Sequence, residues 1–154
     1  MAGKVIRAVD WALRLTLGAI FLYAGALHAW DTQGFFVAIQ HYQILPPDAA
    51  MVLAVWLPWV EIFAAIGLFV ARVRLGAIAA VAGMLCVFIV AIASAQARGL
   101  DISCGCFREA EAIRVNFPEL IARDAAMLAA ALVLWFIESA RQRRALTAPA
   151  PHEK

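Results

Sequence analysis

The sequence predicts an all-α integral membrane protein, a bundle of four transmembrane helices with both termini in the cytoplasm. Of the 154 residues, 65% are hydrophobic and only 16% are charged, and the mean hydropathy is +0.83. A soluble domain of this length cannot bury so much apolar surface. The apolar residues also form stretches of roughly 20, the length of helix that crosses a bilayer. Strands are excluded, because these stretches show no alternation of apolar and polar residues.

Four such stretches define the predicted spans. They cover residues 11–30, 49–70, 75–97 and 118–138. The last span begins at Pro118, because proline is favoured in the first turn of a helix. Residues 1–140 therefore form the membrane domain, and residues 141–154 form a basic, Pro- and Ala-rich tail that we expect to be disordered.

The positions of lysine and arginine predict the orientation. They precede the first span, fill the connection between the second and third, and follow the fourth: Lys4, Arg7, Arg72, Arg74, Arg141, Arg143 and Arg144. Basic residues stay on the cytoplasmic side, so both termini are cytoplasmic and residues 98–117 face outward. We expect a multi-pass protein of the bacterial inner membrane that contacts the lipid bilayer. A net charge of +2 gives no reason to expect a nucleic acid partner.

The first span has a second interpretation. Lys4 and Arg7, an apolar run and then Ala24-Gly25-Ala26 also fit a signal peptide with a small-residue cleavage site. Cleavage would leave three spans and place the arginines after the last span on the wrong side. We therefore favour a retained span.

Two cysteines separated by one glycine lie in the outer loop, where thiols can be oxidised. A disulfide between Cys104 and Cys106 would close a very small ring, which Gly105 permits through its backbone freedom. Such a disulfide is strained and therefore suited to exchange. Arg108 follows nearby, and its positive charge favours the Cys106 thiolate. We predict a redox-active dithiol.

Other roles for the cysteines remain open. The CGC could form a stable local disulfide, or a soft-metal site completed by His41. Zinc is disfavoured because a structural zinc site takes four ligands with wider pair spacing. Cys86 lies midway along the third span with no second cysteine at its depth, so we expect a small buried hydrophobic residue.

Ionisable residues within the spans are further candidates. Glu61 lies near the middle of the second span, shortly after Pro58, and Arg123 lies about two turns into the fourth. Charges at such depths are costly and usually functional. Arg123 could pair with Glu61, or hold the CGC sulfurs near a positive charge. An ion pair with a purely architectural role is equally open.

The outer end of the first span gathers more polar residues. His28, His41 and Tyr42 are predicted near the same face as the cysteines. Residues 35–47, FFVAIQHYQILPP, look like a short amphipathic segment on the outer surface that could cover the site as a lid. Trp56 and Trp59 could hold a membrane quinone, although tryptophans in a span commonly face lipid or core.

Four segments together resemble the MauE branch of the DoxX-like membrane proteins. They are FLYAGALHAWDTQGFFVAIQHYQILPP, LAVWLPWVEIFAAIGLFV, CGCF and ARDAAMLAAALVL, within roughly residues 9–140, and LPWVE and CGCF are the most specific. The resemblance implies a four-helix membrane bundle with a part in methylamine utilisation. Such proteins are needed for maturation of the disulfide-rich small subunit of methylamine dehydrogenase, alongside a thioredoxin-like periplasmic protein. His28 stands where relatives often have lysine.

The cysteine pattern and the family resemblance both point to a membrane thiol–disulfide redox component, which could be an oxidoreductase. Cys104 and Cys106 would exchange electrons with a thioredoxin-like partner that serves a disulfide-rich client, and a membrane quinone would be the electron source or sink. The alternative is a non-catalytic assembly factor or a copper-binding protein, whose CGC binds a client or a copper ion.

Overall fold

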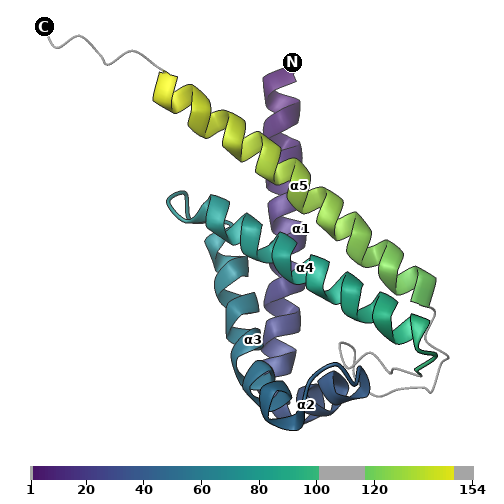
Figure 1. The fold of residues 1–154 in the computed structure, drawn as a ribbon. Coiled ribbons are helices and arrows are strands. Elements are labelled where there is room, and N and C mark those ends of the chain that lie inside the picture. Colours follow the sequence, from purple (N-terminus) through teal and green to yellow (C-terminus); the bar gives the residue numbers. More distant parts are fainter. Residues whose placement is uncertain (1, 101–116, 148–154) are drawn as a thin grey trace, which may run out of the picture.

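A computed structural model describes residues 2–100 and 117–147, and every element in these two ranges is an α-helix (Figure 1). The helices are α1 (Ala2–Trp30), α2 (Thr32–His41), α3 (Pro47–Gly67), α4 (Arg74–Ala97) and α5 (Phe117–Thr147). The all-α prediction is confirmed. Pro47 opens α3 and a second proline, Pro58, lies inside the helix.

The helix ends differ from the predicted spans mainly at the termini of the chain. α1 begins well before the apolar stretch, and α5 continues through Thr147. Residues 141–147, which we placed in a disordered tail, are therefore helical. Alanine, leucine, arginine and glutamine favour the helix, and no helix breaker occurs before Pro149. Residues 148–154 lie outside the described ranges.

Among residues 2–100 and 117–147, three helices are long and apolar enough to cross a membrane. They are Pro47–Gly67, Arg74–Ala97 and Phe117–Arg143, with mean hydropathies of 2.0, 2.7 and 1.9. The chain is a multi-pass membrane protein. α1 is not among the three, and its first half carries four charged residues: Lys4, Arg7, Asp10 and Arg14. A fourth span therefore stays a prediction.

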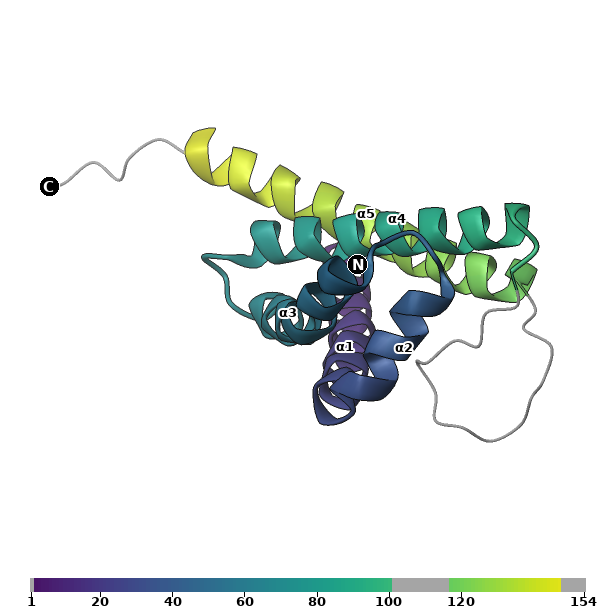
Figure 2. The same cartoon turned by 60° about the horizontal axis from the view of Figure 1, so that its bottom comes forward.

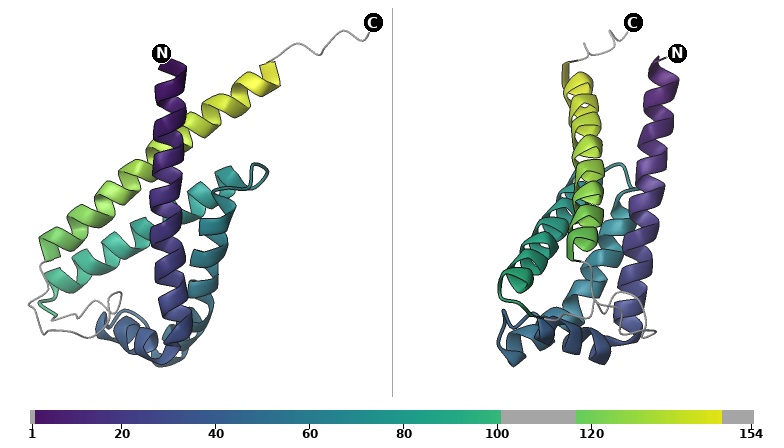
Figure 3. Two further views of the ribbon diagram at one scale, coloured as in Figure 1. Left: turned by 180° about the vertical axis from the view of Figure 1, so that it is seen from behind. Right: turned by 90° about the vertical axis from the view of Figure 1, so that its right-hand side faces the viewer.

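The long helices form two pairs. α1 packs along α3, α4 packs along α5, and the second pair is inclined to the first (Figures 1 and 3). α2 lies at one end of the molecule, as the view toward that end shows (Figure 2). The N-terminus and the end of α5 lie at the opposite end, and the α3–α4 turn lies between the two ends (Figures 1 and 3). The ends of α4 and α5 that flank residues 101–116 lie at the same end as α2 (Figure 1).

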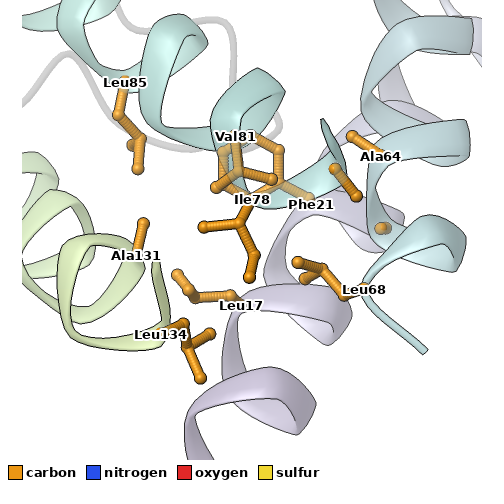
Figure 4. Close-up of a cluster of buried hydrophobic side chains, with 11 residues drawn as sticks. Leu17, Phe21, Ala64, Leu68, Ile78, Val81, Leu85, Ala131 and Leu134 are labelled. Atoms are coloured by element: carbon orange, nitrogen blue, oxygen red, sulfur yellow. The ribbon is translucent and has the colours of Figure 1, made fainter. Parts of the chain in front are cut away.

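The core forms where the two pairs meet (Figure 4). Its largest buried side chains come from three helices and the residue that follows α3: Leu17 and Phe21 of α1, Leu68 after α3, Ile78, Val81 and Leu85 of α4, and Leu134 of α5. Small residues allow close approach between helices, as expected for membrane bundles. A Cβ atom at Gly67 would lie 2.8 Å from the Cβ of Ala77.

The outward faces of the helices are strongly apolar. Phe63, Val87 and Phe136 are each more than 65% exposed, which fits contact with lipid. Cys86 is also exposed, so our expectation of a buried cysteine is wrong. In a helix that is apolar on all sides, hydropathy cannot distinguish the lipid-facing side from the core.

Candidate functional site

Most of the buried charged or ionisable residues gather at two places along α1, and Asp124 on α5 pairs with its neighbour Arg123. Six charged or ionisable side chains are buried in the described ranges: Asp10, Arg14, His28, Glu61, Asp124 and Glu138. His28 follows Asp10 by 18 positions, about 27 Å at the helical rise. The hydrocarbon core of a bilayer is ~30 Å thick. The two places therefore lie about one membrane thickness apart.

The arginine network occupies the end with the termini. We use this name for Asp10, Arg14, Arg74, Glu138 and Arg141. Arg14 Nη2 donates to Asp10 Oδ1 at 2.6 Å and to Glu138 Oε2 at 3.2 Å. Arg141 Nη1 donates to Asp10 Oδ2 at 2.9 Å, and Arg74 Nη1 lies 3.4 Å from both Glu138 oxygens. The network ties together α1, α4 and α5.

Arg74 also closes the end of α3. Its Nε donates to the carbonyl of Leu68 at 3.1 Å, and its Nη2 lies 3.5 Å from the carbonyl of Phe69. Carbonyls at a helix C-terminus lack partners within the helix, so the guanidinium fills this need. All three cations of the network are arginines, which keep their charge in proteins. The network therefore holds α1, α4 and α5 together through permanently charged arginines, which is a structural role.

The His–Glu pair lies near the other end of α1, and we use this name for His28 and Glu61. His28 Nδ1 lies 3.0 Å from Glu61 Oε2, and the two residues are 4% and 1% exposed. The ring of Phe35 from α2 stacks on the imidazole, with centroids 3.9 Å apart and planes 11° apart. α1, α3 and α2 each contribute one of the three side chains.

Gly25 sets the distance between α1 and α3 at this point. A Cβ atom on Gly25 would lie 2.9 Å from the carbonyl oxygen of Pro58 and 3.1 Å from the Cβ of Glu61. His28 lies three residues later and so projects from nearly the same face of α1. The close backbone approach at Gly25 therefore brings His28 within hydrogen-bonding reach of Glu61.

α2 covers the pair and is held at both ends. Asp31 caps its first turn by accepting from the Gly34 amide at 2.8 Å. At the other end, Arg98 from the end of α4 donates to the carbonyl of Gln43 at 3.1 Å and to that of Tyr42. Phe35 and Ala38 are buried. Of the predicted amphipathic segment, residues 35–47, the part up to His41 belongs to helix α2, and its action as a lid stays a prediction.

Of the two roles left open for Arg123, the pairing with Glu61 is not what the structure has. Arg123 Nε and Nη2 donate to Asp124 Oδ1 at 3.1 and 3.0 Å. Its side chain is 40% exposed, whereas the Asp124 side chain is buried. The neighbouring carboxylate satisfies the guanidinium, and Glu61 binds His28 from α1 instead.

The other predicted residues are spread over the molecule. His41 is exposed at the end of α2, and Trp56 and Trp59 are 66% and 49% exposed on α3. Within residues 2–100 and 117–147, no three His, Cys, Asp or Glu side chains are grouped as metal ligands would be. Three predicted site residues lie outside the described ranges: Cys104, Cys106 and Arg108.

The arginine network was not predicted. Asp10 and Arg14 have the i, i+4 spacing of an intrahelical ion pair, which could have been recognised in the sequence. Their link to Glu138 spans 124 positions of the chain. No local pattern could reveal that contact.

A family model described as methylamine utilisation protein MauE matches residues 6–137. The chain belongs to the MauE family. It is 35% identical over 127 residues to the methylamine utilization protein MauE of Paracoccus denitrificans, covering 82% of this chain and 68% of that protein. The protein of the same name from Paracoccus versutus is 34% identical over 125 residues, covering 80% and 67%. No solved structure matches the chain significantly. The matched range contains the His–Glu pair and the CGC.

Proposed function

We propose that this MauE-family protein is an inner-membrane component of methylamine utilisation that carries out thiol–disulfide exchange at the periplasmic face. The family match over residues 6–137 carries the proposal, because that range includes Cys104 and Cys106. The role in methylamine utilisation follows the printed name of the relatives. The thiol chemistry follows from two cysteines in a segment that sequence reasoning places outside the cytoplasm.

The arrangement of the helices supports this placement. The last turn of α4 and the first turn of α5 lie toward the same end of the molecule as α2, away from the termini (Figure 1). Lys4 and Arg7 belong to the first two turns of α1, at the other end, and Arg72 belongs to the α3–α4 turn, which lies between the two ends (Figure 1). With α1 as the fourth span and these residues in the cytoplasm, α2 and both helix ends that flank residues 101–116 face the periplasm.

The exchange would proceed through a mixed disulfide. A thiolate of one partner attacks a sulfur of the other's disulfide, and the second cysteine of the attacking pair then displaces the partner. A thioredoxin-like protein of the periplasm is the proposed partner, and it would serve a disulfide-rich client. Trp56 and Trp59 are exposed on α3, and a membrane quinone held against them would be the electron source or sink.

Replacing one cysteine at a time tests the proposal. Cys104→Ser or Cys106→Ser leaves a mixed disulfide that its neighbour can no longer resolve. We expect either variant to accumulate a reductant-sensitive adduct with a thioredoxin-like periplasmic protein in cells, detected by non-reducing electrophoresis. Cys86→Ser is the matched control and should give no adduct, because Cys86 faces outward from α4 in a predicted span.

Two results would contradict thiol exchange. One is the absence of an adduct in both single variants, and the other is full function of the Cys104→Ser/Cys106→Ser double variant. Tight binding of Cu(I) by the wild-type protein, together with either result, would favour a copper-binding assembly factor instead.

A further inference from the structure

An apolar groove runs between α1 and α3, and the proposed thiol exchange makes no use of it. Its volume is about 400 Å³. Three residues of each helix form its exposed sides: Leu15, Ala19, Leu22, Ile66, Phe69 and Val70. α3 is one of the helices long and apolar enough to cross a membrane, so the groove lies at a depth where lipid surrounds the protein. Its occupant must therefore be apolar along most of its length.

Small residues form the floor of the groove. Gly18 and Ala65 line it from α1 and α3, and both are buried. A Cβ atom on Gly18 would lie 2.8 Å from Cε2 of Phe69, so the phenyl ring lies directly over the glycine. Ala19, beside Gly18, contributes only a methyl group. These small side chains leave a space that suits an extended hydrocarbon chain.

The length of the groove matches one leaflet of a bilayer. Trp11 lies one turn before Leu15, and its ring centroid lies 6.4 Å from that of Phe69. Trp11 is 52% exposed, and tryptophans of membrane proteins concentrate at the level of the lipid headgroups. From Trp11 to Leu22, α1 rises roughly 17 Å, about half of the ~30 Å hydrocarbon core. The groove therefore begins at an interface near Trp11 and has the length of one acyl chain of that leaflet.

Basic side chains lie just beyond the Trp11 end of the groove. Arg7 precedes Trp11 by four positions and so lies on the same face of α1, and Lys4 lies one turn further. Arg72 follows Val70 by two residues, in the α3–α4 turn. All three cations are exposed. None of them takes part in an ion pair within residues 2–100 and 117–147. Both helices that form the groove thus lead to exposed positive charge.

No exposed carboxylate offsets these cations in the part of the chain that the structure describes. The exposed acids there are Asp31, Asp48 and Glu119, which lie at or near the starts of α2, α3 and α5, at the opposite end (Figure 1). Asp10 and Glu138 are nearer to the cations, but both are buried and bound by arginines. A surplus of basic residues next to a membrane span attracts anionic lipid headgroups. The charge pattern therefore favours an anionic occupant over an uncharged one.

We propose that the groove binds an anionic phospholipid from the leaflet next to Trp11. One acyl chain lies between α1 and α3, and the phosphate is held by Arg7 and Arg72, with Lys4 adding positive charge. The predicted orientation makes this the cytoplasmic leaflet, whose surface is negative. The site goes beyond the proposed function and does not depend on it.

Native mass spectrometry of the detergent-solubilised protein tests the headgroup preference by counting bound lipids. Dioleoyl phosphatidylglycerol is the anionic probe, and dioleoyl phosphatidylcholine carries the same chains without net charge. We expect the first phosphatidylglycerol to bind on the order of 25-fold more tightly, because each of two basic residues near the headgroup contributes about fivefold.

Single charge variants locate the phosphate. Arg7→Gln and Arg72→Gln should each weaken the binding of phosphatidylglycerol about fivefold and leave that of phosphatidylcholine unchanged. Arg143→Gln is the matched control. It removes the same charge from an exposed position on α5, which contributes no residue to the groove, and should bind phosphatidylglycerol like wild type.

A filled groove tests the place of the acyl chain. Ala19→Phe occupies the groove without changing the charge, and we expect it to abolish the preferred phosphatidylglycerol site. Ala79→Phe is its control, because Ala79 is exposed on α4, which does not line the groove. Thermal unfolding without added lipid checks that each variant is folded. The charge variants test the proposal even if Ala19→Phe does not fold.

Four results would overturn the proposal. Equal affinity for the two lipids would indicate an uncharged occupant. Equal weakening by Arg7→Gln, Arg72→Gln and Arg143→Gln would indicate attraction to the whole basic end of the protein. Unchanged binding in a folded Ala19→Phe would place the lipid elsewhere. Displacement of phosphatidylglycerol by inorganic phosphate would indicate a site for soluble anions. None of these measurements needs thiol activity, so failure of the lipid site and failure of the proposed exchange are distinguishable.

Discussion

The arginine network and the His–Glu pair both bury charge against α1, about 27 Å apart, yet they differ in chemistry. The network consists of three arginines, which stay charged, and they make five hydrogen bonds to its two carboxylates. The pair has a single hydrogen bond, an aromatic cover and one ring nitrogen left without a partner. Buried charge alone therefore does not mark a functional site.

The largest effect is expected from Arg14→Met, which breaks the network at its only fully buried cation. Asp10 Oδ1 would lose its partner in a buried environment. Removing one member of a buried ion pair costs on the order of 3–5 kcal/mol. Thermal unfolding in detergent should show a strong loss of stability. Arg72→Met is the control, because Arg72 is exposed in the α3–α4 turn. Similar stability of both variants would contradict a structural network.

Gly25→Ala should be the next most severe change, and it acts on the pair through the backbone. The new Cβ would meet the Pro58 carbonyl at 2.9 Å, so α1 and α3 must separate. Overpacking of this kind costs about 1–3 kcal/mol. Gly83→Ala is the control on α4, where nothing lies within 4 Å and alanine favours the helix. If Gly25→Ala unfolds at the wild-type temperature, the close approach does not position His28.

A double-mutant cycle sharpens the assignment of the partner of Glu61. Glu61→Gln and His28→Gln should be coupled by about 0.5–3 kcal/mol in unfolding, because the side chains are in contact. Glu61→Gln and Arg123→Gln should add within ~0.5 kcal/mol, because Arg123 binds Asp124. Coupling between Glu61 and Arg123, together with additivity between Glu61 and His28, would show that Glu61 pairs with Arg123 instead.

Phe35→Leu should have the smallest effect on stability, because it removes only the ring that stacks on the His28 imidazole. Loss of the stacked ring contact is worth about 0.5–1.5 kcal/mol beyond the area buried. Phe36→Leu changes a half-buried neighbour on the same helix and should cost less. Urea unfolding of the two variants gives the difference. Equal losses would show that α2 covers the pair without a specific contact.

The sequence predicts much of the fold, because long apolar stretches determine where membrane helices lie. The start and end of α4 agree with the predicted span to within one residue, and the surface helix α2 is also predicted. Glu61 is identified as a site candidate by its depth alone. Its partner could not be identified, since His28 lies 33 positions away and the contact depends on close helix packing at Gly25. The outward position of Cys86 was equally hidden, because lipid and core are both apolar.

The central claim is that the arginine network holds the fold while thiol exchange takes place at Cys104 and Cys106. The most direct test is the rate of thiol exchange per folded molecule, compared between Arg14→Met and the Cys104→Ser/Cys106→Ser double variant after normalisation to folded protein in the membrane. We predict that Arg14→Met lowers the folded yield but keeps the wild-type rate per molecule, because Arg14 belongs to the buried network, and that the double variant keeps most of the yield but loses the exchange. Equal loss of rate per molecule in both variants, or a wild-type rate in the double variant, would contradict the account.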